Sequence, residues 1–278
     1  MEPLVHPIHS SDGLALTVEE YGAPGTTASV VFLPALGVPL AYYRRLFETW
    51  AARGRHIVGV ELRGMPQSPV ADLRRDSFGY AHLVREDLPA VFAGPAVAAA
   101  DRVVLVGHSL GGQLALLSGA SGTVRPEAVV TIATGTSSTA AHRSLLGRAR
   151  RAAGVRFVAA VTCSLGYWPG HRLGFAGRQP RHLMFDWGYE ARYGRYRLAG
   201  DKTDYEAALG NLKLPTLLVQ IAGDRLVPAA AVDHLAGRLP ADVARATIDA
   251  TPDHLLWARR TPEKVIEGVE SWLATQHL

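Results

Sequence analysis

Short apolar runs alternate along most of the chain with stretches in which apolar residues recur every three or four positions. The apolar runs predict β-strands at residues 14–20, 29–34, 56–61, 102–107, 127–133, 215–222 and 243–249. The stretches between them predict amphipathic helices at residues 42–53, 78–93, 109–119 and 261–274. Alternation of this kind is typical of α/β proteins in which helices cover both faces of a mostly parallel sheet. We therefore predict an α/β fold with such a sheet, and an early hairpin that contains the first strand.

Residues 136–205 interrupt this alternation. The segment holds 10 of the 21 aromatic residues, and its 12 basic and 4 acidic side chains give it a net charge of +8, whereas the rest of the chain has a net charge of −4. It lies between two predicted strands and lacks the regular spacing of strands and helices. We interpret it as a mainly helical insertion, the cap, which covers a core formed by residues 1–135 and 206–278.

The composition excludes several classes of protein. With 48% hydrophobic and 19% charged residues in a chain of 278, a substantial core is available and a disordered protein is excluded. The single cysteine, Cys163, allows no internal disulfide and argues against a cysteine-based metal site. We find no signal peptide and no apolar run long enough to span a membrane, so we expect a cytoplasmic protein without a membrane span. The net charge of +4 comes without a nucleic-acid-binding motif, so we expect no nucleic acid partner.

A candidate nucleophile lies at the end of a predicted strand. Residues 107–111 read GHSLG, which is the pattern G-x-S-x-G, and they follow the apolar run RVVLV and open a predicted helix. The turn in such a strand–turn–helix unit is so tight that only small neighbours fit beside the serine, and Gly107 and Gly111 supply that room. The hydroxyl of Ser109 would then point out of the sheet at the positive end of a helix. We predict that Ser109 is a nucleophile.

This motif and its context resemble those of the α/β-hydrolase superfamily, and the resemblance covers nearly the whole chain. The chain is similar to capped bacterial serine hydrolases related to serine aminopeptidases and monoacylglycerol lipases. Two further stretches resemble a subgroup of these hydrolases, PALGV (residues 34–38) and YYR (residues 42–44). The resemblance implies an α/β-hydrolase fold with a helical cap insertion and a Ser-His-Asp triad that needs no metal and no organic cofactor. Arg63, in the Arg-Gly pair after a strand, resembles an arginine that is structural in the family.

The resemblance also assigns the acid and the base. Asp224, in the run GDRLVP after a predicted strand, is similar to the family's acid, which accepts the imidazole N–H and stabilises the imidazolium. His254 lies in a loop after the last predicted strand, and the order Ser109, Asp224, His254 matches that of the family. Four rival residues have weaker positions, in a helical pattern or away from the end of a buried strand: His234, Asp201, Asp204 and Asp233.

Two backbone N–H groups are expected to stabilise the charge that develops on the substrate carbonyl oxygen. One belongs to Leu110, the residue after the nucleophile. By resemblance the other belongs to Leu36, in the loop after the strand at residues 29–34. Many family members have His-Gly in that loop, where this chain has Pro34 and Ala35, so the sequence leaves the geometry of the loop open.

The cap is expected to shape the substrate pocket. Some of its aromatic side chains would line an apolar pocket over Ser109, while others would form the core of the cap itself. The residues that we predict to contact the substrate are His108, Tyr167, Trp168, Trp187 and Tyr189. Arginines at the rim of the pocket would attract an anionic substrate, and the candidates are Arg192, Arg195 and Arg197. The alternatives are that these arginines form a solvated face or meet an acidic patch in a dimer.

The sequence thus predicts a serine hydrolase that cleaves a small-molecule ester or thioester, carrier-bound or anionic substrates included, through an acyl-enzyme intermediate. The alternative is an acyltransferase, because passing the acyl group to an alcohol or amine would use the same triad. A non-catalytic ligand-binding protein on the same fold is a third interpretation, which the intact Ser, His and Asp argue against. The sequence does not separate the first two and leaves the oligomeric state open.

Overall fold

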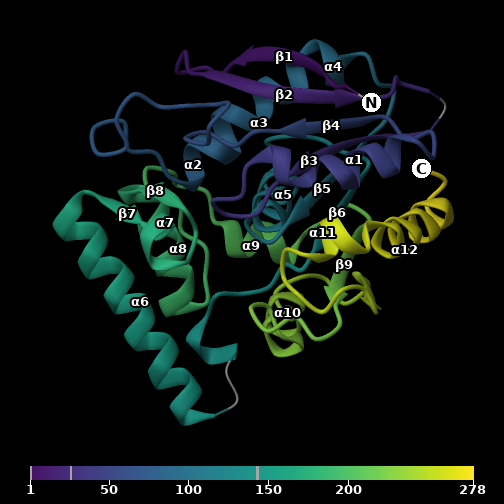
Figure 1. Cartoon of the computed structure of the whole chain (residues 1–278). Coiled ribbons are helices and arrows are strands. Elements are labelled where there is room, and N and C mark those ends of the chain that lie inside the picture. The colour runs from purple at the N-terminus through teal and green to yellow at the C-terminus, as the bar shows by residue number, and fades with distance from the viewer. Residues whose placement is uncertain (1, 26, 142–143) are drawn as a thin grey trace.

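The computed structural model describes residues 2–25, 27–141 and 144–278 (Figure 1). In this part of the chain one sheet has eight strands in the order β1-β2-β4-β3-β5-β6-β9-β10. Neighbours from β4 to β10 are parallel, and the pairs β1–β2 and β2–β4 are antiparallel. The strands of this sheet are β1 (Leu4–His9), β2 (Ala15–Tyr21), β3 (Ser29–Leu33), β4 (Ile57–Val60), β5 (Val103–His108), β6 (Ala128–Ile132), β9 (Thr216–Ile221) and β10 (Ala244–Ile248). The predicted α/β fold with a mostly parallel sheet is confirmed.

Helices cover both faces of the sheet, with α1, α11 and α12 packed together on one face and α5 on the other (Figure 1). Those outside the cap are η1 (Leu40–Tyr43), α1 (Arg44–Ala51), α2 (Tyr80–His82), η2 (Leu83–Asp87), α3 (Leu88–Ala93), α4 (Pro95–Ala98), α5 (Leu110–Ala120), α9 (Tyr205–Gly210), α10 (Ala229–Ala236), α11 (Trp257–Arg260) and α12 (Pro262–Thr275). Within the described residues, cap included, no helix combines the length and the apolar character needed to cross a membrane.

Burial of the central strands explains why they read as continuous apolar runs. All five residues of β3 and all five of β6 are buried. Neighbouring side chains of β3 point to opposite faces of the sheet. Val31 and Leu33 belong to the core on the side of α5, whereas Val30 and Phe32 belong to the core on the side of α1 and α12. Helices on both faces therefore leave no solvated side to these strands, which is typical of parallel sheets.

The strand β1 is absent from the sequence prediction, which contains only its partner β2. Among its six residues only Ile8 is buried, because β1 lies at the edge of the sheet. It also contains Pro7, which an edge strand tolerates but which argues against a strand in a sequence prediction. With one buried position, β1 lacks the alternation of apolar and polar residues on which that prediction depends.

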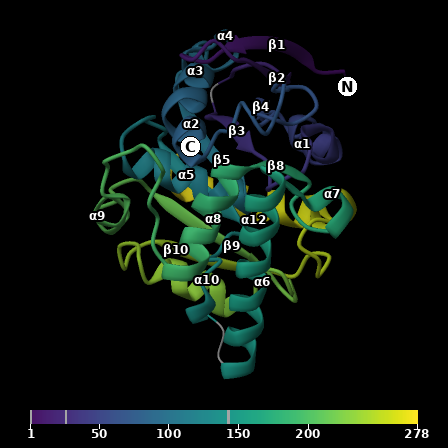
Figure 2. The same ribbon diagram turned by 90° about the vertical axis from the view of Figure 1, so that its left-hand side faces the viewer.

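The cap emerges between two adjacent strands, β6 and β9, and gathers on one side of the sheet (Figures 1 and 2). Its helix α6 packs against α8, and a short antiparallel pair, β7–β8, accompanies them. The cap is thus mainly helical, with two short strands that the sequence did not predict. Its elements are η3 (Thr139–Ala141), α6 (Leu145–Leu165), β7 (Tyr167–Pro169), α7 (Gly170–Leu173), β8 (Arg178–Pro180) and α8 (Arg181–Tyr193).

A buried carboxylate joins the cap to the core. Asp186 of α8 accepts hydrogen bonds from the N–H of Tyr80, at the start of α2 (2.8 Å), and from the N–H of Ala199 (3.1 Å). Gly79 allows this approach, because a Cβ atom at that position would lie 2.4 Å from the carboxylate. Burial raises the pKa of Asp186 to about 6. These contacts hold α8 against the beginning of α2.

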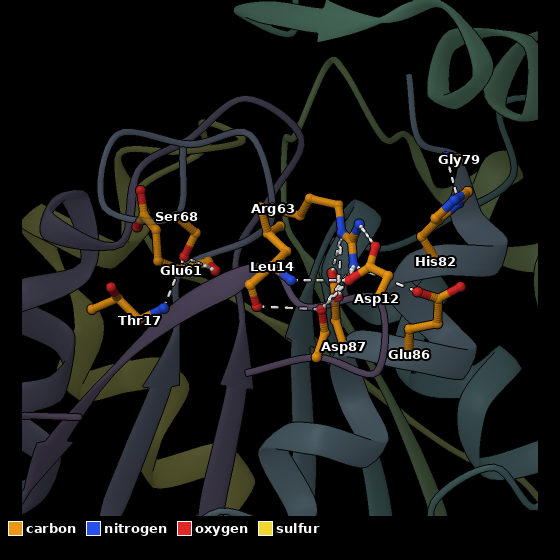
Figure 3. A network of polar contacts seen from close by, with 11 residues as sticks. Asp12, Leu14, Thr17, Glu61, Arg63, Ser68, Gly79, His82, Glu86 and Asp87 are labelled. Atoms are coloured by element: carbon orange, nitrogen blue, oxygen red, sulfur yellow. Dashed lines mark hydrogen bonds and ion pairs between the residues drawn. The ribbon is translucent and has the colours of Figure 1, made fainter. Parts of the chain in front are cut away.

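A network of charged side chains lies beside the hairpin of β1 and β2 (Figure 3). The guanidinium of Arg63, just after β4, donates to Asp87 in η2 (Nε to Oδ2, 3.0 Å) and forms an ion pair with Asp12 in the hairpin turn. The hydrogen bond from Arg63 holds the pKa of the Asp12 carboxyl below its usual range. Arg63 thereby connects three segments of the core, which agrees with the structural role that the sequence indicates.

Candidate active site

Ser109 occupies a strained turn between β5 and α5. Its φ of 54° lies in the left-handed region, which non-glycine residues rarely adopt. Two glycines make the turn sterically feasible. A Cβ atom at Gly107 would lie 2.2 Å from the backbone of Gly111, and one at Gly111 would lie 2.1 Å from the carbonyl oxygen of Leu33 in β3. The tight turn expected of the G-x-S-x-G pattern is therefore present, and α5 begins directly after the serine.

The structure brings Ser109, His254 and Asp224 into one hydrogen-bonded series. The Oγ atom of Ser109 lies 2.9 Å from Nε2 of His254, and Nδ1 of His254 lies 2.8 Å from Oδ2 of Asp224. Asp224 comes from the loop after β9 and His254 from the loop between β10 and α11. Parallel strands bring these loops together, because their carboxyl ends meet at one edge of the sheet.

The hydrogen bonds of Asp224 determine which ring nitrogen of His254 carries the proton. Its Oδ1 atom accepts the N–H groups of Leu226 (2.8 Å) and Val227 (3.1 Å), so Oδ2 remains for the imidazole. A carboxylate can only accept a hydrogen bond here, so Nδ1 of His254 must carry a proton, and this N–H donates a hydrogen bond to Asp224. In the neutral imidazole Nε2 is then the acceptor, which can take the proton of the Ser109 hydroxyl.

The rival residues lie elsewhere. Asp233 forms an ion pair with Arg245, and Asp201 accepts from Thr203 and Tyr205. The other two, His234 in α10 and Asp204 at the start of α9, make no described hydrogen bond to Ser109 or His254 and lie outside the cavity beside Ser109. Asp253, which adjoins His254, accepts the N–H groups of Leu255 and Leu256. Within the described residues no cluster of three or more His, Cys, Asp or Glu side chains is arranged to hold a metal ion.

The two predicted oxyanion donors lie beside Ser109. Leu110 is the first residue of α5, and the first N–H groups of a helix have no acceptor within the helix. The N–H of Leu36 makes no hydrogen bond among the described residues. Both residues line the same cavity as Ser109. The structure thus leaves two N–H groups free on the loops that adjoin the serine, which is what stabilisation of an oxyanion requires.

A tyrosine that the sequence analysis did not select links these loops. The N–H of Ala35, next to Leu36, donates to the hydroxyl of Tyr43 (3.0 Å), and this hydroxyl lies 2.7 Å from Nδ1 of His108. His108 precedes the nucleophile, and its ring lies 4.9 Å from that of His254. Burial holds the pKa of His108 well below its usual range, so the ring is neutral and Nδ1 can accept from Tyr43. The only signal in the sequence is a tyrosine on the apolar face of a helix, where its hydroxyl needs a partner.

Replacing Tyr43 with phenylalanine is expected to lower kcat about 10-fold with little change in KM, because the N–H of Ala35 loses its hydrogen-bond acceptor and the loop that carries the Leu36 N–H is held less firmly. Steady-state kinetics on any ester that the enzyme cleaves would measure the two constants separately. Tyr42→Phe is the matched control, because no described hydrogen bond involves the Tyr42 hydroxyl. Equal kcat values for the two variants would show that the Tyr43 hydroxyl does not position the loop.

A small cavity of about 70 Å³ adjoins Ser109 beneath the cap. Its lining combines apolar side chains with polar ones, such as Gln113 and Thr136, and includes one cationic side chain. The residues that bear on its chemistry are Leu36, Leu110, Leu226 and Val227 from the core and Arg151, Phe175 and Trp187 from the cap. Residues of the segment 136–205 thus lie next to Ser109, and one of the predicted substrate contacts, Trp187, lies in this cavity.

The other four predicted contacts do not line the cavity. His108 is fully buried behind the nucleophile, between Tyr43 and Trp257. Trp168 belongs to the core of the cap, where its indole N–H donates to the carbonyl of Phe175. The ring of Tyr167 lies between the guanidinium groups of Arg74 and Arg178, and that of Tyr189 packs against Tyr193 and Arg197. Packing within the cap thus takes most of its aromatic side chains away from the site.

The predicted arginine rim is also placed differently. Arg192, Arg195 and Arg197 are exposed and are not among the residues that line the cavity. The arginine that reaches it is Arg151, on the face of α6 that packs towards α8. The periodicity of α6 does not single out this residue, because three other arginines share the helix.

Comparisons with known proteins agree with this architecture. The sequence profile of the alpha/beta hydrolase family matches residues 30–267. Alpha/beta hydrolase domain-containing protein 10 from mouse superimposes with a TM-score of 0.67 at 15% identity, over 98% of this chain and 99% of that chain. A monoacylglycerol lipase from Paleococcus ferrophilus gives 0.62 at 15% identity, over 94% and 98%. The thioesterase domain from the curacin biosynthetic pathway gives 0.62 at 13% identity, over 96% and 99%.

At these identities the structural similarity establishes the fold and not the substrate. No curated protein matches the chain by sequence. The family profile, however, spans most of the chain and includes the segments that carry Ser109, Asp224 and His254. The chain therefore belongs to the alpha/beta hydrolase family.

Proposed function

We propose that the protein is a serine hydrolase that cleaves an ester or thioester through an acyl-enzyme intermediate. The observation that carries this proposal is the unbroken hydrogen-bonded series from Ser109 through His254 to Asp224, next to a cavity and two free N–H groups. The names of two similar structures, a thioesterase domain and a monoacylglycerol lipase, agree with acyl chemistry.

In the first half of the reaction Ser109 is acylated. As its Oγ atom attacks the substrate carbonyl, Nε2 of His254 takes the hydroxyl proton, and Asp224 stabilises the imidazolium that forms. The N–H groups of Leu36 and Leu110 donate to the oxygen that becomes negative. The intermediate then collapses, the bond to the leaving group breaks, and His254 passes its proton to the departing alcohol or thiol.

In the second half water releases the acyl group. Nε2 of His254, neutral again, takes a proton from a water molecule as its oxygen attacks the acyl carbon of the Ser109 ester. Collapse of the second intermediate returns the proton to Oγ of Ser109 and frees the carboxylic acid. Net, one ester or thioester and one water give one acid and one alcohol or thiol.

Labelling and turnover together test this proposal. A fluorophosphonate probe should label Ser109, as located by mass spectrometry of peptides, and a panel of short acyl esters and thioesters should be hydrolysed. The panel is run with and without added alcohols and amines, because an acyltransferase would divert the same acyl-enzyme to those acceptors. Labelling of Ser109 with transfer products in place of the free acid would favour the acyltransferase. Failure of both labelling and turnover would favour a ligand-binding protein.

A further inference from the structure

Arg151 brings a positive charge to the cavity next to Ser109. Its Nε–H donates to the carbonyl oxygen of Ser137 (3.0 Å), and its guanidinium carbon lies 5.1 Å from the centre of the Trp187 ring. These two contacts hold the guanidinium next to Trp187 and the backbone of Ser137. No ion pair joins Arg151 to a carboxylate among the described residues, and its two terminal amino groups have no described acceptor.

Glu190, the acidic side chain that acts electrostatically on Arg151, already has hydrogen bonds to other partners. Glu190 accepts from the hydroxyl of Thr136, from the N–H of Ser137 (2.8 Å) and from Arg238 (3.3 Å). Glu190 acts on the Arg151 charge only through its electrostatic field, without a described hydrogen bond or ion pair. Burial lowers the pKa of Arg151, but a guanidinium stays protonated in proteins. A partly buried charge without a partner is unfavourable, so binding of an anion at this place would be favourable.

The size and lining of the cavity restrict the ligand. Its volume of about 70 Å³ is well below the roughly 300–1,000 Å³ of pockets for drug-sized molecules, so it admits a short chain and not a long acyl group. A ligand with a few methylene groups could pack against the apolar side chains of Leu36, Phe175 and Val227. A guanidinium binds the planar pair of carboxylate oxygens through two parallel hydrogen bonds, and one arginine suffices for that.

We propose that the enzyme prefers small esters that carry a free carboxylate a few atoms from the scissile carbonyl, and that Arg151 binds this carboxylate. This inference rests on the proposed function, because Arg151 would bind the carboxylate of the same ester whose carbonyl carbon Ser109 attacks. Arg151 thus replaces Arg192, Arg195 and Arg197 as the group that recognises an anionic substrate.

Isosteric pairs of substrates test the preference. Monomethyl succinate is compared with methyl isohexanoate, in which an isopropyl group replaces the carboxylate on the acyl side. β-Acetoxypropionate is compared with isoamyl acetate, which makes the same replacement on the alcohol side. The wild-type protein should have a higher kcat/KM for the charged member of at least one pair, and the pair concerned tells which side of the ester lies next to Arg151.

Variants then assign the preference to Arg151. In Arg151→Met the ratio of kcat/KM for charged over neutral ester should fall roughly 10- to 100-fold, the usual effect of losing a hydrogen-bonded charge pair. Arg151→Lys keeps the charge and should retain more of the ratio. Arg150→Met, which removes an exposed arginine from the same helix, should leave the ratio unchanged.

A binding measurement separates failure of this inference from failure of the proposed function. In the inactive Ser109→Ala protein, calorimetry should detect at least one of the two charged esters, monomethyl succinate or β-acetoxypropionate, and not its neutral isostere, and the added Arg151→Met substitution should abolish that binding. Turnover of neutral esters with no preference for charged ones, or an equal loss on both in Arg151→Met, overturns the role of Arg151 alone. If no ester is cleaved but the charged ester still binds through Arg151, the proposed function is wrong and the anion site stands.

Discussion

Ser109→Ala is expected to lower kcat by about 10⁴- to 10⁶-fold while the protein stays folded. Loss of the nucleophile removes the acyl-enzyme route altogether and leaves only what the oxyanion donors and substrate binding contribute. The fold should persist, because the only described partner of the Oγ atom is Nε2 of His254. The N–H of residue 109 donates to the carbonyl of Ile132, and its carbonyl accepts from the hydroxyl of Thr134. These hydrogen bonds do not involve the Ser109 side chain.

The measurement is kcat on the best ester of the panel, together with the melting temperature of the purified variant. Ser164→Ala is a suitable control, because that hydroxyl is exposed on α6 and donates only within its own helix. Activity of Ser109→Ala within 10-fold of the wild-type value, in a preparation free of contaminating esterase, would rule out Ser109 as the nucleophile.

Asp224→Asn is expected to lower kcat by about 10³- to 10⁴-fold, although only an oxygen is exchanged for an NH₂ group. The N–H groups of Leu226 and Val227 require an acceptor, so the amide oxygen of the substituted side chain should keep the place of Oδ1. The NH₂ group then faces His254 and can only donate. Nδ1 of His254 must become an acceptor, which moves the proton to Nε2 and leaves no base for the Ser109 hydroxyl.

Two comparisons make this prediction specific. His254→Ala should be at least as damaging as Asp224→Asn, because it removes the base and not only its orientation. Asp253→Asn should change kcat by less than about 3-fold, since Asp253 accepts from the N–H groups of Leu255 and Leu256 and does not contact the imidazole. Rescue of Asp224→Asn by a neighbouring carboxylate would appear as a kcat close to that of the wild-type protein, and Asp253 would then be the first residue to test in a double variant.

Much of the fold could be predicted from local patterns of apolar and polar residues. Strands such as β3 and β6 are buried on both faces, so their apolar character is visible without any tertiary information. The turn at Ser109 is local only in part. Gly107 is required by the nearby backbone of Gly111, whereas Gly111 is required by the carbonyl oxygen of Leu33 at the end of β3, which is distant in the chain. The edge strand β1 is the counterexample, since one buried residue in six leaves almost no pattern to detect.

What the sequence by itself determined is therefore the α/β class of the fold and the buried strands of its parallel sheet, and through resemblance it indicated Ser109, His254 and Asp224 as the candidate reacting groups. Only the tertiary structure decided which cap side chains face Ser109 and what holds the loop at Leu36. The sequence pattern of α6 is weakly amphipathic, with exposed apolar residues such as Leu145 and Phe157, so it does not say which residue meets Ser109 and which meets the other helix. Arg151 and Trp187 reach the cavity, whereas Trp168 packs within the cap. Contacts of this kind join residues far apart in the chain, so they follow from how the cap packs on the core and not from any local pattern.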